Sequence, residues 1–215
     1  MTLIKRSVMT LYSGALDIFS HQVRLVLAKK GVSVDIINVD MNHPCEDLAR
    51  LNPYNTLPTL VDRDLVLYHA DVIMEYLDER FPHPPLLPVY PVARAKSRLM
   101  IHRFKKDFYS IVRTIEADRD PMAVDRARKE LQEGLIALEP VFANMPYFLS
   151  EEFTLVDCII GPLLWRLPLW GIEIPDSVKG VHEYAERVFS DDSFLASLTD
   201  SEREIRSPSH EVRES

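Results

Sequence analysis

The first third of the chain alternates short β-type runs with segments in which apolar positions recur at helical spacing. Runs rich in β-branched and aromatic residues predict strands, and apolar positions three and four residues apart predict helices. In chain order the predicted elements are strand 8–12, helix 20–30, strand 34–39, helix 46–51, strands 59–62 and 65–68, and helix 70–80. Strands that share a layer with helices on its faces make one compact unit. The order therefore predicts an α/β domain, β-α-β-α-β-β-α, over residues 8–83.

A proline-dense segment follows at 84–91. Proline removes backbone donors and disfavours helical geometry in the residue before it, so this segment is predicted to be a stiff, extended linker. Beyond it, apolar positions recur at helical spacing in segments 92–115, 121–142, 155–170, 177–189 and 192–198. They predict an all-helical domain over 92–199. The remaining residues, 200–215, are rich in Glu, Arg and Ser and are predicted to form a disordered tail.

Local signals set the ends of two helices. Thr154 and Asp157 form a predicted capping box, in which the threonine oxygen accepts a free amide and the aspartate reaches back to the amide of Thr154. The helix that follows is apolar nearly all round and is predicted to be central and buried. In the first domain, Ser20 is the predicted N-cap of helix 20–30, and Gly31 supplies its left-handed end.

The chain carries a net charge of −8. Direct DNA binding uses positive charge against the phosphates, so this balance argues against sequence-specific DNA contact. Neither cysteine belongs to a Cys-x-x-Cys pair and the seven histidines lack metal-ligand spacing, so we expect no metal and no other cofactor. No apolar run is long enough to span a bilayer, and the first residues lack the pattern of a secretory signal. We therefore expect a cytoplasmic protein that does not contact a membrane.

Several segments carry a resemblance to a known group of proteins. They are LYSGALDIFSHQVRLVLAKKGV at 11–32, LNPYNTLPTLVD at 51–62, IMEYLDERFPHPPL at 73–86, PVYPVAR at 88–94 and YFLSEEFTLVDCIIGPLLWRLP at 147–168. With them the chain resembles the glutathione-transferase superfamily, and within it the bacterial starvation-protein branch. The resemblance implies a thioredoxin-like first domain, a helical second domain, a homodimer, and a cis peptide bond before Pro58.

The same resemblance locates the positions that would carry catalysis. Transferases of this superfamily place an activating Ser, Cys or Tyr between the first strand and the first helix. Segment 13–20 contains no cysteine, and its hydroxyl candidates are Ser20 and, more weakly, Ser13. Transferases also carry an acid or amide followed by Ser or Thr at the start of the helix after the fourth strand, where this chain has His69 and Ala70. The sequence therefore predicts a protein that is not an enzyme, and a glutathione-dependent transferase acting through Ser20 is the alternative.

A stiff proline ridge is the predicted partner surface. Pro82, His83 and Pro84 offer apolar area and an imidazole that cost little to order on binding, and Tyr90 lies just downstream. The resemblance implies that this ridge contacts RNA polymerase holoenzyme. The leading hypothesis is a regulator of transcription in starvation and acid stress that acts by protein–protein contact. A direct DNA-binding regulator is a third reading, which the acidic charge disfavours.

Overall fold

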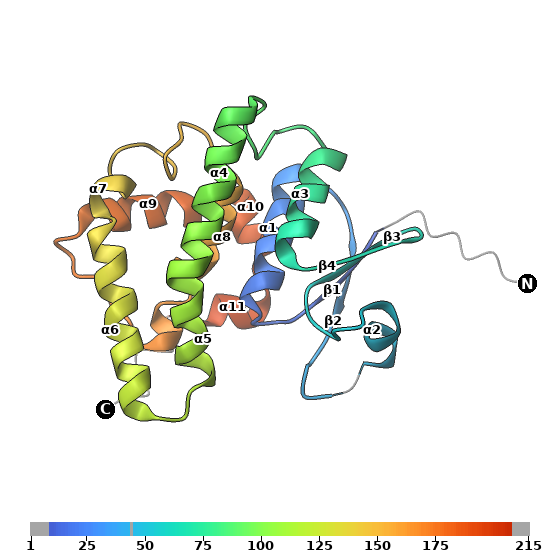
Figure 1. The fold of residues 1–215 in the computed structure, drawn as a ribbon, viewed down its shortest axis with the longest axis horizontal. Helices are drawn as coiled ribbons and strands as arrows, with labels where there is room; N and C mark the ends of the chain where they lie inside the picture. The colour runs from blue at the N-terminus through green and yellow to red at the C-terminus, as the bar shows by residue number, and fades with distance from the viewer. Residues whose placement is uncertain (1–8, 44, 208–215) are drawn as a thin grey trace, which may run out of the picture. The chain divides into compact units, whose positions relative to one another are not determined.

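The computed structural model describes residues 9–43 and 45–207, which form two compact units. Unit 1 contains the described residues up to Pro84 together with Asp192–Glu204, and unit 2 contains Pro85–Asp191 and the described residues from Ile205. Figure 1 shows the strands with their helices in the one unit and helices alone making up the other. The element order confirms the predicted β-α-β-α-β-β-α domain and the helical domain after it.

Unit 1 is built on a mixed sheet of four strands in the order β2-β1-β3-β4. The strands are β1 (Thr10–Ser13), β2 (Asp35–Asn38), β3 (Thr59–Asp62) and β4 (Leu65–Tyr68). β1 pairs in parallel with β2 and antiparallel with β3, and β3 pairs antiparallel with β4. Leu11 of β1 lies opposite Leu60 of β3, and both are buried. Val8, the first residue of the predicted strand, lies outside the described residues.

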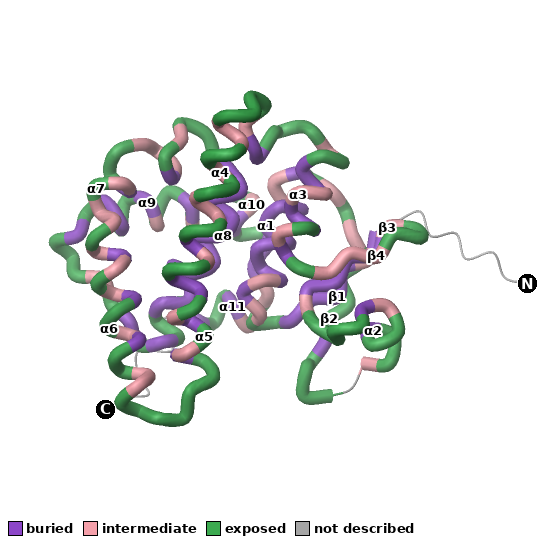
Figure 2. Tube along the Cα trace, in the orientation of Figure 1, coloured by how far each residue is buried: buried purple, intermediate pink, exposed green. Residues whose placement is uncertain are grey.

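Helices α1 (Ile18–Lys30), α2 (Glu46–Leu51) and α3 (Ala70–Arg80) complete the predicted part of unit 1. α1 and α3 pack against each other, and Figure 2 shows α1 buried over most of its length. α2 covers a separate apolar cluster, in which Leu48 packs with Tyr12 and Val61 of the sheet. The core of unit 1 therefore lies where its sequence pattern puts the apolar faces.

The C-terminal segment corrects two predictions. Helix α10 (Asp192–Ser197) packs on α1 and belongs to unit 1, and helix α11 (Asp200–Glu204) stands where a disordered tail was predicted. Glu202 is completely buried; its carboxylate accepts from the amide of Thr199, whose hydroxyl accepts from the amide of Glu202. This reciprocal cap is the Thr-x-x-Glu signal, which the polar composition of the segment concealed. Residues 208–215 of the predicted tail lie outside the described residues.

Unit 2 consists of helices, and the predicted segments 121–142 and 155–170 are each interrupted near a proline. Its α-helices are α4 (Pro91–Phe104), α5 (Ser110–Ala117), α6 (Pro121–Ala137), α7 (Glu139–Phe142), α8 (Leu155–Trp165) and α9 (Lys179–Phe189), and a π-helical turn, Lys105–Tyr109, joins α4 to α5. Leu138 lies between α6 and α7, with Pro140 in the first turn of α7, and Pro168 leads a 3-10 turn, Pro168–Trp170, after α8. Proline lacks the amide that would extend a helix. Across residues 9–43 and 45–207, no helix is long and apolar enough to cross a membrane.

Asp157, near the start of α8, gathers four hydrogen bonds in the core of unit 2. Its Oδ2 accepts from the amide and hydroxyl of Thr154 at 2.8 and 3.0 Å, and the Thr154 hydroxyl accepts from the amide of Val156 at 3.2 Å. The Oδ1 accepts from the amide of Phe148 at 2.9 Å and from the hydroxyl of Tyr184 at 2.7 Å. Burial raises the pKa of the Asp157 carboxyl, and these donors act against that rise. The capping box therefore also joins α9 and the segment before α8 to one carboxylate.

Candidate functional site

The end of β1 and the start of α1 are the first places to look for chemistry, because they hold the two candidate serines, Ser13 and Ser20. Helix α1 begins at Ile18, with Asp17 as its N-cap, so the prediction that Ser20 caps the helix is wrong. The Asp17 carboxylate accepts from the amide of Ser20 at 2.7 Å and from its hydroxyl at 2.5 Å. Aspartate caps a helix as well as serine does. The helix therefore starts two residues earlier, and Ser20 becomes its third residue.

The Ser20 hydroxyl is committed to this turn. It donates its hydrogen to Asp17 and accepts from the amide of Gly14 at 3.1 Å, and the side chain is completely buried. Gly14 itself is tightly enclosed, because a Cβ added there would come within 2.8 Å of the Cβ of Asp17. A serine that stabilises a thiolate must aim its one hydrogen at the sulfur. In this chain that hydrogen already points at a carboxylate.

Ser13 is held by a buried arginine of α1. Its hydroxyl oxygen accepts from Nη1 of Arg24 at 2.5 Å, and both residues are buried. Arg24 also donates through Nη2 to both carboxylate oxygens of Glu202 at 2.7 Å and through Nε to the carbonyl of Ser197 at 2.9 Å. Ser13 is therefore the end of a network that joins α1 to α10 and α11, all within unit 1.

His21 belongs to the same network. Its Nε2 lies 3.0 Å from the Ser197 hydroxyl, its Nδ1 lies 3.6 Å from a carboxylate oxygen of Glu202, and its ring lies 5.2 Å from the ring of Phe194. The imidazole is completely buried. Buried polar side chains are usually hydrogen-bonded by their neighbours. The contacts of His21 therefore help to hold α10 and α11 against α1. No local pattern indicates this cluster, because its members lie about 175 residues apart along the chain.

The start of α3 corresponds to the second anchoring position. His69 precedes the helix with a backbone φ of 80° and makes no side-chain cap, and Ala70 is buried. His69 is exposed. Alanine offers no hydroxyl to a γ-glutamyl group, and an imidazole does not replace the carboxylate that would pair with its ammonium. Nearby, the Leu57–Pro58 peptide bond is cis.

The predicted partner residues all reach solvent. Pro82, His83 and Pro84 are exposed at the end of unit 1, and the His83–Pro84 bond is cis, which the sequence analysis did not anticipate. The carbonyl of Pro84 accepts from the ammonium of Lys30, which also pairs with Asp78 at 2.6 Å. Tyr90, in unit 2, is 79% exposed. Within the described residues, no group of three or more His, Cys, Asp or Glu side chains could hold a metal ion.

Sequence comparison places these observations among known proteins. The family model described as glutathione S-transferase, N-terminal domain, matches residues 7–79, and the one described as the C-terminal domain matches residues 99–192. A stringent starvation protein A homolog from Coxiella burnetii is 58% identical over 205 residues, which cover 95% of this chain and 98% of that protein. A stringent starvation protein A homolog from Pasteurella multocida is 54% identical over 195 residues, covering 90% and 92%.

Structural comparison adds a likeness in fold. The crystallographic structure of a Tau class glutathione S-transferase from mango, Mangifera indica, has a TM-score of 0.80 to this chain, with 20% sequence identity. The match covers 92% of this chain and 96% of that one. At that identity the likeness concerns the arrangement of the backbone, and the chemistry of the site has to be read from the residues themselves.

Proposed function

Because this chain belongs to the stringent starvation protein A family, built on the glutathione S-transferase fold, we propose that it regulates transcription by binding RNA polymerase holoenzyme. It acts in the cytoplasm during starvation and acid stress, through protein–protein contact and without glutathione chemistry. The observation that carries this proposal is the internal use of both candidate hydroxyls: Ser20 donates to Asp17, and Ser13 accepts from Arg24 and donates to the carbonyl of Gly14 at 3.5 Å. Because both hydroxyls bond within the protein, neither is positioned to activate a thiol. The proposed function therefore depends on contacts made by the protein surface.

Glutathione is expected to bind weakly or not at all. A ligand that loses one buried polar partner loses about 1–3 kcal/mol of binding energy, and here both the thiol site and the γ-glutamyl anchor lack their partners. Calorimetric titration with millimolar glutathione is expected to give no saturable heat, and a chlorodinitrobenzene assay no turnover above background. A saturable heat together with turnover that disappears in Ser20→Ala would establish the transferase alternative instead.

The exposed proline segment supports the polymerase contact. Proline-rich segments pay little conformational entropy on binding, because their backbone is already restricted. Pro82 to Pro84 are exposed, and Lys30 holds the segment at the carbonyl of Pro84. Exposed aromatic side chains such as Tyr90 often anchor protein interfaces. Pro82 to Pro84 offer a partner apolar area with one imidazole in unit 1, and Tyr90 offers an exposed ring in unit 2.

The double variant His83→Ala/Pro84→Ala is expected to lose at least about tenfold in affinity for RNA polymerase holoenzyme, since interface hot spots cost about 2 kcal/mol or more on truncation. Surface plasmon resonance on purified holoenzyme measures the loss. His43→Ala/Pro53→Ala is the matched control, because it removes an exposed histidine and an exposed proline from the same unit. Equal binding by the two double variants, both with unchanged thermal melts, would reject the assignment, and the single variant His83→Ala tests it without altering the proline.

A homodimer completes the proposal. On α3 the exposed Val72 shares a helix face with Glu75 and Glu79. On α4 the exposed Val92 and Leu99 share a face with basic residues, Lys96 and Arg103. Packing α3 of one copy on α4 of a second copy would bury these apolar side chains and bring opposite charges together. Each copy would then carry its own proline segment to the polymerase.

A further inference from the structure

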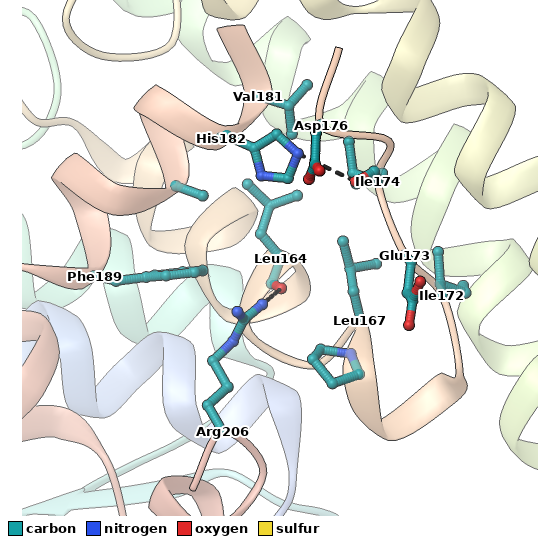
Figure 3. A pocket seen from close by; sticks show the side chains of 12 residues that line it. Leu164, Leu167, Ile172, Glu173, Ile174, Asp176, Val181, His182, Phe189 and Arg206 are labelled. Atoms are coloured by element: carbon teal, nitrogen blue, oxygen red, sulfur yellow. Dashed lines mark hydrogen bonds between the residues drawn. The ribbon is translucent and has the colours of Figure 1, made fainter. Parts of the chain in front are cut away.

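Unit 2 contains a pocket of about 310 Å³ that plays no part in the proposed polymerase contact. It is bounded by the end of α8, the segment after it, α9 and Arg206 (Figure 3). Its apolar walls come from side chains that are themselves largely buried, Leu164, Leu167, Ile172, Val181 and Phe189. Small-molecule sites begin at about 300 Å³ and combine apolar walls with a few polar groups. The size suits a molecule with about as many atoms as an amino acid.

Arg206 supplies the positive charge of this pocket. Pro168 stops α8, so the last carbonyls of the helix need other donors, and Arg206 donates to those of Leu164 at 2.7 Å and Trp165 at 3.0 Å. Its guanidinium carbon lies 4.8 Å from the ring centre of Phe189 and 5.2 Å from that of Trp165. These contacts use Nε, Nη2 and the faces of the guanidinium, and they fix its position.

The remaining nitrogen of Arg206, Nη1, makes no hydrogen bond within the part of the chain that the structure describes, and no described carboxylate lies within ion-pair distance of the guanidinium. Burial lowers the pKa of Arg206 to about 10, so the side chain is still charged at neutral pH. A positioned guanidinium with a donor to spare is the group that binds carboxylates best. One side of the pocket therefore suits an anion.

The other side carries negative charge. Glu173 and Asp176 line the pocket and are exposed, and Figure 3 shows them away from Arg206, with Leu164 and Leu167 drawn between. Beside them, Nε2 of His182 lies 3.1 Å from the carbonyl of Ile174 and 3.2 Å from that of Pro175, which orients its ring at the rim. Neither carboxylate has an ion pair among the described residues. A simple anion would be repelled at this rim, and an ammonium would be attracted.

We propose that this pocket binds a free amino acid with an apolar side chain. Its carboxylate pairs with Nη1 of Arg206, its ammonium lies toward Glu173 and Asp176, and its side chain packs on the apolar walls. A zwitterion is the one small ligand class that satisfies both charges at once. The pocket lies wholly within unit 2, and none of its lining residues belongs to the proposed polymerase contact.

Calorimetry on the full chain tests the charge requirement with matched probes. L-leucine and L-phenylalanine are titrated beside leucinamide, which lacks the carboxylate, and 4-methylpentanoate, which lacks the ammonium. We expect leucine, phenylalanine or both to bind, and each analogue to bind leucine's site about ten- to a hundredfold more weakly, since each loses one charge-assisted contact. Absence of saturable heat from both amino acids would overturn the proposal, and so would 4-methylpentanoate binding as tightly as leucine.

Variants then place the binding in this pocket. Arg206→Met is expected to abolish amino-acid binding, and Glu173→Gln/Asp176→Asn to weaken it about tenfold. Glu183→Gln is the matched control. It removes an exposed carboxylate of α9, the helix that carries His182, but Glu183 does not line the pocket, so the affinity should stay unchanged. Because Arg206 also completes the end of α8, its variant can lose stability, and the Glu173/Asp176 double variant then decides. Unchanged affinity in that double variant would contradict the proposal.

Discussion

Replacing Asp157 with alanine is expected to lower the free energy of unfolding by roughly 4 kcal/mol or more. The change deprives four donors of their acceptor: the amides of Phe148 and Thr154 and the hydroxyls of Thr154 and Tyr184. All four hydrogen bonds are buried, so water cannot replace the lost acceptor. Each unpaired donor therefore destabilises the folded state. Urea unfolding followed by circular dichroism measures the loss, and a melt should fall by about 10 °C.

Two further variants test whether the loss of stability comes from losing the Asp157 carboxylate or would follow from replacing any aspartate of unit 2. Asp157→Asn retains an oxygen but turns an amide group toward two of the donors, so it should be nearly as damaging as alanine. Asp125→Ala removes an exposed carboxylate of α6 and should stay within about 0.5 kcal/mol of the parent. A stable Asp157→Ala protein would mean that the hydrogen bonds at the start of α8 do not hold unit 2 together.

Glu202→Gln is expected to cost roughly 3–5 kcal/mol, because it leaves the guanidinium of Arg24 charged and buried without its counter-charge. The two side chains meet through two bonds of 2.7 Å and are almost wholly inaccessible. The same change weakens the reciprocal cap between Glu202 and Thr199. Helix α11 should therefore unfold locally more often. Hydrogen exchange would then report faster exchange in 192–204 together with α1.

The double variant Arg24→Met/Glu202→Met should recover part of that stability, since it removes the uncompensated charge. Full recovery is not expected, because the Ser13 hydroxyl, the Ser197 carbonyl and the Thr199 amide lose their partners. Arg50→Met breaks the exposed pair with Glu46, 3.1 Å apart, and serves as the surface control, with an expected change within about 0.5 kcal/mol. If Glu202→Gln were as harmless as Arg50→Met, the C-terminal segment would contribute nothing to the stability of unit 1.

Much of the fold could be predicted because local sequence patterns specify most of its helices and strands. The four strands and the helices of the first domain follow the alternation and spacing of apolar residues, and the capping box of α8 is present as the sequence predicts. The end of α8 was harder to place, because the apolar pattern continues past Trp165 to Trp170 while a 3-10 turn begins at Pro168. A periodic pattern shows which face of a helix is buried. It does not show where a proline, which has no amide to donate, ends the helical hydrogen bonding.

The candidate site was predictable only in its outline. The absence of a cysteine from 13–20 and the presence of His69 and Ala70 can be read from the sequence. That Asp17 takes the capping role, and that Ser20 gives its hydrogen to it, depends on side-chain geometry. Aspartate and serine are both competent N-caps, so composition leaves the choice between Asp17 and Ser20 open.

The sequence by itself determined the order of elements in the first domain, the family, and the presence of His69 and Ala70 at the start of α3, because each can be read from short segments of the chain. The tertiary structure alone decided the use of Ser13, the burial of Glu202 in a segment that reads as a loose tail, and the position of Arg206 at the end of α8. Each of these joins partners that are distant in sequence. A charged side chain is placed by the buried partner it finds after folding, and no local pattern records where that partner will be.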